Sequence, residues 1–308
     1  MRGFLSGTFA AVLFLSSILV MVRAGVDPVA LAIHIAFFVA CLTLIGAWES
    51  LAPWRERTAR TGRRWRTNIG VLLARDGFTA LLLPLGLGAV AAACAAHGIG
   101  LFNIVEAPVW VQYAATIIVL DALAWLAHYL LHRVPTLWAI HEVHHSDEEL
   151  DATSVLRGHP LEAAFRLLTY LAGVVALGMP AHAILVAVLL RHVFSTFHHG
   201  SMALPPRFEA LLRLVIVTPI HHRIHHSAAQ EDYDSNFAQI FSVWDRVFGT
   251  WREDAAVGND AIAFGLGEAR MDDPDDLWTL LVHPFRRARE ANAGTAAAPA
   301  ATGRQAAA

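Results

Sequence analysis

Long stretches without a charged residue constrain the fold of this chain more than any other feature. Residues 4–22, 28–48 and 77–96 contain no Asp, Glu, Lys or Arg, and residues 107–131 contain only Asp121. Each stretch is long enough for an α-helix to cross a bilayer. Charged residues make up 16% of the 308 residues, whereas soluble domains carry about 25%. The sequence therefore predicts an integral membrane protein.

A fifth uncharged stretch, residues 167–190, is interrupted near its middle. Gly178 and Pro180 stand there, and Gly is typical of the position after a helix, whereas Pro is typical of the start of the next one. We therefore expect a hairpin of two short helices, 161–177 and 181–197. This brings the expected number of membrane helices to about six.

Charge and composition divide the chain into three parts. Residues 54–66 contain six Arg and one Glu, and short cytoplasmic loops of membrane proteins collect Arg and Lys. Residues 1–66 therefore read as an N-terminal membrane hairpin with an Arg-rich cytoplasmic loop. Residues 67–290 hold the other spans and, from residue 204, an amphipathic helical cap, and residues 291–308 predict a disordered tail. The expected fold is an all-α, multi-pass membrane bundle with this cap on its cytoplasmic side.

Histidines form three dense patterns near the expected cytoplasmic ends of the spans. One HxxxH pattern and two HxxHH patterns are present, and residues i, i+3 and i+4 share one face of a helix. At the histidine frequency of this chain, 17 in 308, HxxHH is expected by chance about 0.05 times. The eight histidines are His128, His132, His141, His144, His145, His222, His225 and His226.

Eight converging imidazoles are too many for one metal ion and therefore indicate two. Imidazole binds Fe, Zn, Cu and Ni alike, so the ligand type alone does not select the metal. The only cysteines, Cys41 and Cys94, lie far apart in apolar runs, which excludes a Cys-rich zinc site and a Cys-ligated iron–sulfur cluster.

Several other residues join the candidate site. His199 lies at the cytoplasmic end of the hairpin and is a candidate ninth ligand, while His159 and His192 are weaker candidates. Asp121 lies two helical turns before the first pattern, inside a membrane span, where a carboxylate is costly and needs a partner. Glu142 lies within the second pattern. We expect Glu142 to be a carboxylate near the metals rather than a ligand. Asp121 has either the same role or a structural one, as a hydrogen-bond partner of another helix.

These segments resemble the fatty acid hydroxylase/sterol desaturase superfamily. The resemblance is carried by HYLLHR (128–133), WAIHEVHHSDEELDATSVLRGHPLE (138–162), HRIHHS (222–227) and SNFAQIFSVWDRVFGTW (235–251). It implies a non-haem di-iron membrane enzyme that uses O₂ to hydroxylate or desaturate a fatty acyl, sterol-like or other lipid. It also implies that the eight patterned histidines and His199 bind the metals. The chain departs from the family at His192, where Asn is frequent, and at Ala238, where Gly is common.

The resemblance also implies partners. The sequence has no Gly-rich dinucleotide fingerprint, so electrons are expected from NAD(P)H through a separate ferredoxin, cytochrome b5-like carrier or reductase. The net charge of −3 gives no reason to expect a nucleic-acid partner.

The composition and the Arg-rich loop also predict a location. All 23 basic residues are Arg, which together with the many Ala suggests a GC-rich bacterial genome. We therefore expect a bacterial inner membrane, with both termini and the histidines on the cytoplasmic side. A Zn or Ni transporter and a single-zinc membrane hydrolase are the alternatives.

Overall fold

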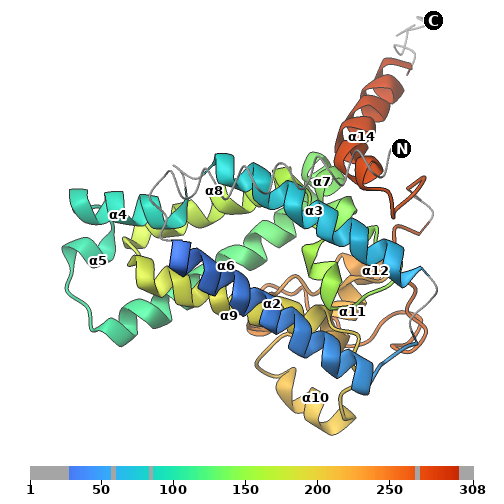
Figure 1. Ribbon diagram of the computed structural model, residues 1–308, viewed down its shortest axis with the longest axis horizontal. Coiled ribbons are helices and arrows are strands. Elements are labelled where there is room, and N and C mark those ends of the chain that lie inside the picture. The colour runs from blue at the N-terminus through green and yellow to red at the C-terminus, as the bar shows by residue number, and fades with distance from the viewer. Residues whose placement is uncertain (1–27, 57–59, 83–85, 268–270, 298–308) are drawn as a thin grey trace, which may run out of the picture.

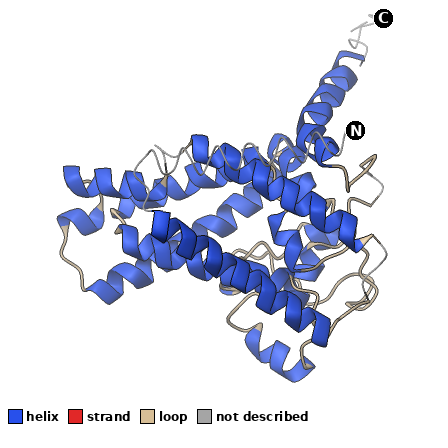
Figure 2. Ribbon diagram, viewed as in Figure 1, coloured by secondary structure: helices blue, strands red, loops and turns tan. Residues whose placement is uncertain are grey.

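The computed structural model describes residues 28–56, 60–82, 86–267 and 271–297. Its regular elements are helices, and among the described residues there are isolated β-bridges but no strand (Figure 1, Figure 2). The predicted all-α fold is confirmed. The predicted first span, residues 4–22, lies outside the described residues, as do residues 298–308 of the predicted tail.

The long helices of the bundle lie side by side along the molecule, and short helices gather at one end (Figure 1). The long helices are α2 (Pro28–Leu51), α3 (Thr61–Leu81), α6 (Val109–Arg133), α8 (Pro160–Leu177) and α9 (Ala181–His199). Two shorter ones, α4 (Leu87–His97) and α5 (Leu101–Ile104), pack against this bundle at its opposite end. The cap contains α7 (Pro135–His145), the 3₁₀-helix η2 (Ala152–Leu156), α10 (Pro206–Leu212), α11 (Pro219–His225), α12 (Gln230–Tyr233), α13 (Val243–Val247) and α14 (Leu277–Ala297).

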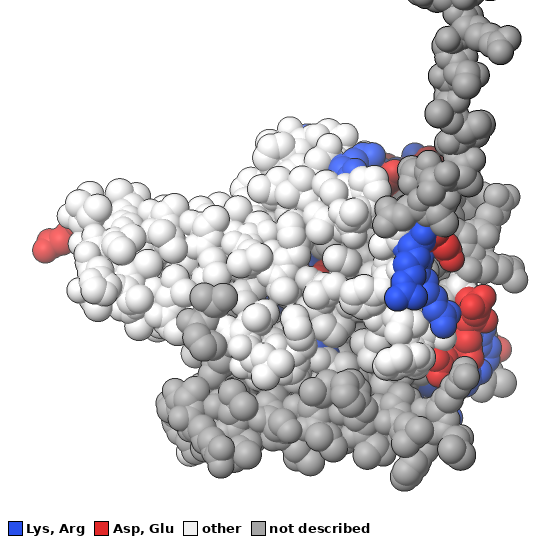
Figure 3. Space-filling view, turned by 90° about the horizontal axis from the view of Figure 1, so that it is seen from above, with Lys and Arg blue, Asp and Glu red and all other residues white. Residues whose placement is uncertain are grey.

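Five helical segments of the described chain are long and apolar enough to cross a membrane. They are Ala32–Leu51, Leu87–Ile104, Val109–Arg133, Pro160–Leu177 and Ala181–His199. Figure 3 shows the charged side chains gathered at the cap end, while the visible described surface of the bundle is almost free of them. The chain is therefore an integral membrane protein, as the sequence predicts.

The predicted hairpin is confirmed. Helix α8 ends at Leu177 and is followed by Gly178, which adopts the left-handed conformation (φ +61°), and α9 begins directly after Pro180. Both arms pack on α6 around a core that includes Ala124, Tyr170 and Val174. The hairpin therefore returns the chain to the cap, so that both its ends lie on the side of the short helices.

The prediction of one continuous helix over residues 77–96 is wrong. Helix α3 ends at Leu81 and α4 begins at Leu87. Leu82 and Gly86, the residues that flank the two helices, are not helical. At the other end of the chain, α14 continues through residues 291–297, which the sequence analysis assigned to the tail.

A close backbone contact at the far end of the bundle generates a stability prediction. Gly100 has a φ of +93°, and a Cβ placed on it would overlap the backbone N and Cα of Gly178 at the tip of the hairpin. We expect Gly100→Ala to lower the free energy of unfolding by about 2 kcal/mol or more, because both the strain and the overlap must be relieved. Thermal unfolding in detergent measures the change.

Gly88→Ala is the matched control, because Gly88 is exposed in α4 and has no neighbour within 4 Å of an added Cβ. Alanine favours a helix by up to about 1 kcal/mol over glycine, so this variant should be at least as stable as the parent. Equal midpoints for the two variants would contradict the role of the Gly100–Gly178 contact.

Candidate metal centre

Nine buried histidines form two adjoining groups where the ends of α6 and α9 meet α7 and α11. The potential ligand atoms of each group all lie within 4.8 Å of one another. The first group, here called the five-His group, is His128, His132, His141, His145 and His225. The second, the four-His group, is His144, His199, His222 and His226. The structure therefore brings together all nine histidines that the sequence analysis proposed as metal ligands.

Each HxxHH pattern contributes to both groups. On α7, His141 and His145 are four residues apart and face the five-His group, whereas His144 faces the other. The third pattern is divided the other way: His222 and His226 belong to the four-His group, and only His225 belongs to the five-His group. The rings of His145 and His226 stack 4.6 Å apart, so the two groups touch each other.

Hydrogen bonds at the outer ring nitrogens fix the orientation of several imidazoles. The Nδ1 atoms of these rings lie 2.7–3.1 Å from acceptor oxygens, so each can donate its N–H outward and direct the lone pair of Nε2 into the group. The acceptors are the carbonyls of Phe237 for His128, Arg157 for His144, Ser195 for His199 and Ser235 for His225, and the Glu162 carboxylate for His141.

The inner nitrogens converge at distances that suit a metal ion. The Nε2 atoms of His128 and His141 lie 3.0 Å apart, and the Nε2 atoms of the four-His group form a chain of contacts at 3.1–3.2 Å. The buried Nε2 atoms of His132, His145 and His225 have no hydrogen-bond partner among the described residues. With metal–nitrogen bonds of about 2.1 Å, two ligands at right angles lie about 3.0 Å apart. Both groups therefore fit a transition-metal ion.

Burial favours the neutral form of five of these imidazoles, those of His144, His145, His222, His225 and His226. It lowers the pKa of His144 to about 3. Burial, followed by the neighbouring imidazoles, also lowers the pKa values of His145, His222, His225 and His226 well below 6.5. Neutral imidazole offers the nitrogen lone pair that a metal requires, so at neutral pH these side chains are ready to bind one.

The two predicted carboxylates lie outside both groups. Asp121 accepts hydrogen bonds from the backbone N–H groups of Ile240 and Phe241 (both 3.0 Å) and from Trp244 Nε1 (2.8 Å). It therefore ties the segment before α13 to α6. Glu142 points away from the histidines toward α14, where it pairs with His283 (2.7 Å) and Arg287 (3.0 Å). Asp121 therefore holds a loop against α6, and Glu142 holds α14 against α7.

The two weaker histidine candidates also lie elsewhere. His159 precedes α8, where its Nδ1 accepts from the N–H of Leu161 (3.1 Å), so it acts as a helix cap. His192 packs against α2, with ring centroids 5.1 Å from His34 and 5.0 Å from Phe38. Neither belongs to the two groups.

Two buried acids that support the site escaped the sequence analysis. Glu162 contacts His141 Nδ1 at 3.0 Å and also accepts from Arg166 Nε at 2.8 Å. Asp245 accepts from the N–H groups of Phe237 and Ala238 and from the side chains of Trp125, Thr250 and His221. The signal for Glu162 was a lone acid in the first turn of an apolar helix, but nothing local showed that it reaches His141.

An aromatic pair separates the five-His group from solvent. Trp138 and Tyr233 stack with ring centroids 5.1 Å apart, and Trp138 lies 4.8 Å from His132 and 5.4 Å from His145. Both aromatic rings are partly exposed at the cap surface. They exclude water from one side of the histidines.

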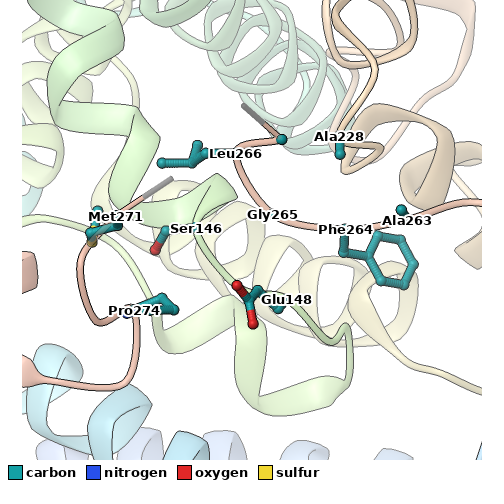
Figure 4. Close-up of a pocket in the computed structure, with 10 residues that line it drawn as sticks. Ser146, Glu148, Ala228, Ala263, Phe264, Gly265, Leu266, Met271 and Pro274 are labelled. Carbon is teal, nitrogen blue, oxygen red and sulfur yellow. The ribbon is translucent and has the colours of Figure 1, made fainter. Parts of the chain in front are cut away.

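A cavity of about 370 Å³ lies in the cap beside segments that follow the histidine patterns (Figure 4). Ser146 and Glu148 follow the second pattern, and Ala228 follows the third. Leu266 and Met271 give the cavity apolar walls. The cavity contains none of the nine histidine side chains, so the metal centre is a separate site.

Comparisons with known proteins match the part of the chain that holds the histidines. Residues 113–250 match the family model for fatty acid hydroxylases, and this range holds all nine histidines. The resemblance inferred from the histidine patterns is thus confirmed over these residues. No solved structure matches the chain.

Curated relatives include alkylglycerol monooxygenases and an ornithine lipid hydroxylase. The human alkylglycerol monooxygenase is 29% identical over 168 residues, which cover 54% of this chain and 35% of the relative. The Xenopus tropicalis enzyme is 31% identical over 126 residues, 40% of this chain and 27% of the relative. The ornithine lipid hydroxylase of Rhizobium tropici is 23% identical over 222 residues, 70% of this chain and 65% of the relative. The chain thus spans about a third of the length of the alkylglycerol monooxygenases.

The Glu162–His141 contact generates a prediction about metal affinity. Glu162→Gln keeps the shape of the side chain but removes its negative charge. That charge orients the His141 ring and strengthens its Nε2 atom as a metal ligand. We expect the affinity for Fe²⁺ to fall about 10–100-fold, as measured anaerobically by competition with a chromophoric chelator. Glu142→Gln is the control, because this buried acid is adjacent to His141 in sequence but faces α14. Equal losses in the two variants would argue against a specific role for Glu162.

Proposed function

We propose that this membrane protein is an O₂-dependent di-iron lipid hydroxylase, because residues 113–250 match the fatty acid hydroxylase family model. The observation that carries the proposal is the pair of adjoining buried groups, with five and four imidazoles, which both draw histidines from the second and third patterns. Both groups lie at one end of the bundle, which favours an enzyme over a transporter, because transport requires polar sites through the depth of the membrane.

In the proposed enzyme, different residues bind the metals, orient the ligands and exclude water. When bound, two iron ions supply the activation of O₂ needed to attack an unreactive C–H bond. The nine histidines hold the ions, and the oxygens that accept from their Nδ1 atoms keep the rings in position. Trp138 and Tyr233 exclude water on the cap side. Together they provide a dry, preorganised site.

We propose a membrane lipid as the substrate. His128, His132 and His199 lie in the last turns of α6 and α9, which are apolar enough to cross the membrane, so a lipid can approach the site from the bilayer. The relatives are named for the oxidation of alkylglycerol and the hydroxylation of ornithine lipid, which favours hydroxylation over desaturation. Electrons come from NAD(P)H through a separate ferredoxin, cytochrome b5-like carrier or reductase.

Metal content and lipid oxidation together test this function. We expect about two iron ions per chain and O₂-dependent hydroxylation of membrane lipids, observed by mass spectrometry. His144→Ala removes a ligand from one group and His225→Ala from the other, so each should lose iron and abolish hydroxylation while the chain remains inserted. The control is His182→Ala, because His182 is exposed at the far end of α9. An iron-free but active parent, or full activity in either ligand variant, would refute the proposal.

We also propose that the cap faces the cytoplasm of a bacterial inner membrane. The Arg-rich segment packs on the cap, where Arg60 pairs with Asp275 and Arg64 with Asp147, so it lies on the same side as the histidines. Short Arg-rich segments favour the cytoplasmic side.

Cysteine labelling in spheroplasts tests this orientation, in a background with Cys41→Ala and Cys94→Ala. Val257→Cys reports the cap and Ile104→Cys the opposite end of the bundle, and both residues are exposed. An impermeant maleimide should label Ile104→Cys directly and Val257→Cys only after permeabilisation. The reverse pattern would show that the cap faces the periplasm.

A further inference from the structure

We propose that one face of the cap is immersed in the lipid leaflet beside α6, at the boundary between headgroups and acyl chains. This inference goes beyond the proposed function and does not depend on it. The face, here called the apolar cap surface, consists of large apolar side chains that are each 43–64% exposed: Phe208, Leu211, Leu214, Val215, Val243, Val247 and Phe248. Soluble surfaces rarely expose a contiguous apolar patch of this kind unless it binds something.

The two segments that form the apolar cap surface are joined into one rigid unit. The N–H of Ser242 donates to the carbonyl of Val215 (3.1 Å), and the N–H of Val217 donates to the carbonyl of Ile240 (2.9 Å). The Arg246 guanidinium also donates to the carbonyls of residues 213 and 214, at 2.8 and 3.2 Å. The exposed residues of α10 and α13 therefore belong to a single built surface.

This unit is attached to α6 within its apolar, membrane-spanning part. Trp244 donates to Asp121 (2.8 Å), and the ring of Phe248 stacks on Trp125 at 4.1 Å. With a rise of 1.5 Å per residue, Trp125 and Asp121 lie about 12 and 18 Å inside the Arg133 end of α6. Since Val109–Arg133 is apolar enough to span the bilayer, a surface fixed at this depth continues the lipid-facing surface of α6.

The charges around the apolar cap surface suit a lipid headgroup. Arg207 and Arg246 are exposed beside the apolar residues. The acids of the same helices, Glu209 and Asp245, are buried and occupied by hydrogen bonds, including the one from the N–H of Ile220 to Glu209 (2.9 Å). The exposed Glu253 nearby is paired with Arg213 (3.2 Å). An apolar face flanked by Arg, whose own helices expose no acid, is typical of elements that lie in the membrane interface.

The attachment also connects the membrane surface to the metal centre. The chain that leads into α13 carries Phe237, whose carbonyl accepts from His128 Nδ1 and whose ring lies 5.0 Å from that of His132. A surface held in the leaflet thus keeps the five-His group at a fixed depth, close to the level of the headgroups.

Site-specific fluorescence in vesicles tests the proposal. The full-length chain, with Cys41→Ala and Cys94→Ala, carries an environment-sensitive label at Leu211→Cys or Val247→Cys. It is reconstituted in phosphatidylcholine–phosphatidylglycerol vesicles, with and without lipids brominated in the upper acyl chain. Val257→Cys is the matched control, because Val257 is 59% exposed but lies outside the apolar cap surface.

At Leu211 and Val247 we expect quenching by the brominated lipids and an iodide quenching constant about tenfold smaller than at Val257. Because the two labels lie on different segments, failure of one variant to fold leaves the other as a test. Iodide access equal to that at Val257 would overturn the proposal. So would protection from iodide without bromolipid quenching, because protein rather than lipid would then cover the surface.

Discussion

The burial of nine imidazoles in one region is the constraint on which the rest of this structure depends. Buried polar nitrogens that lack partners are costly. The outer nitrogens of five rings are satisfied by four carbonyls and one carboxylate, and the inner nitrogens converge on one another. The arrangement of four helices, α6, α7, α9 and α11, places these outer nitrogens against their acceptors and brings the inner nitrogens together. The membrane bundle supplies the rigid frame for this arrangement.

A second layer of the structure depends on buried carboxylates. The described residues contain no strand, so backbone N–H groups in the loops of the cap must find acceptors elsewhere. Asp121 accepts from two such groups, and Asp245 accepts from two others. Hydrogen bonds to a charged acceptor are stronger than those between neutral groups, which helps to hold an irregular segment in place. The loop that carries Phe237 is thereby fixed against α6 and presents its carbonyl to His128.

Local sequence signals predicted the parts of the structure that local rules control. The i, i+3, i+4 spacing identified the histidines, and Gly178 and Pro180 identified the turn of the hairpin. The same rules failed where tertiary contacts decide. They placed the three histidines of one helix on a single face, whereas the structure shares them between two groups. They left open whether Asp121 lies near the metals or forms a structural hydrogen bond, and they could not identify its partners, which come from residues 240–244, far along the chain. Glu162 was missed for the same reason.

The sharing of each HxxHH pattern between the two groups has a mechanical consequence. Helices α7 and α11 are short, and each holds ligand nitrogens of both groups on one backbone. Any rotation of either helix therefore disturbs both sets of nitrogens together. On the function proposed above, an ion bound in one group would fix both helices and leave the neighbouring group already assembled, so a second ion would bind with a smaller loss of conformational entropy. The shared helices would thus couple the filling of the two groups.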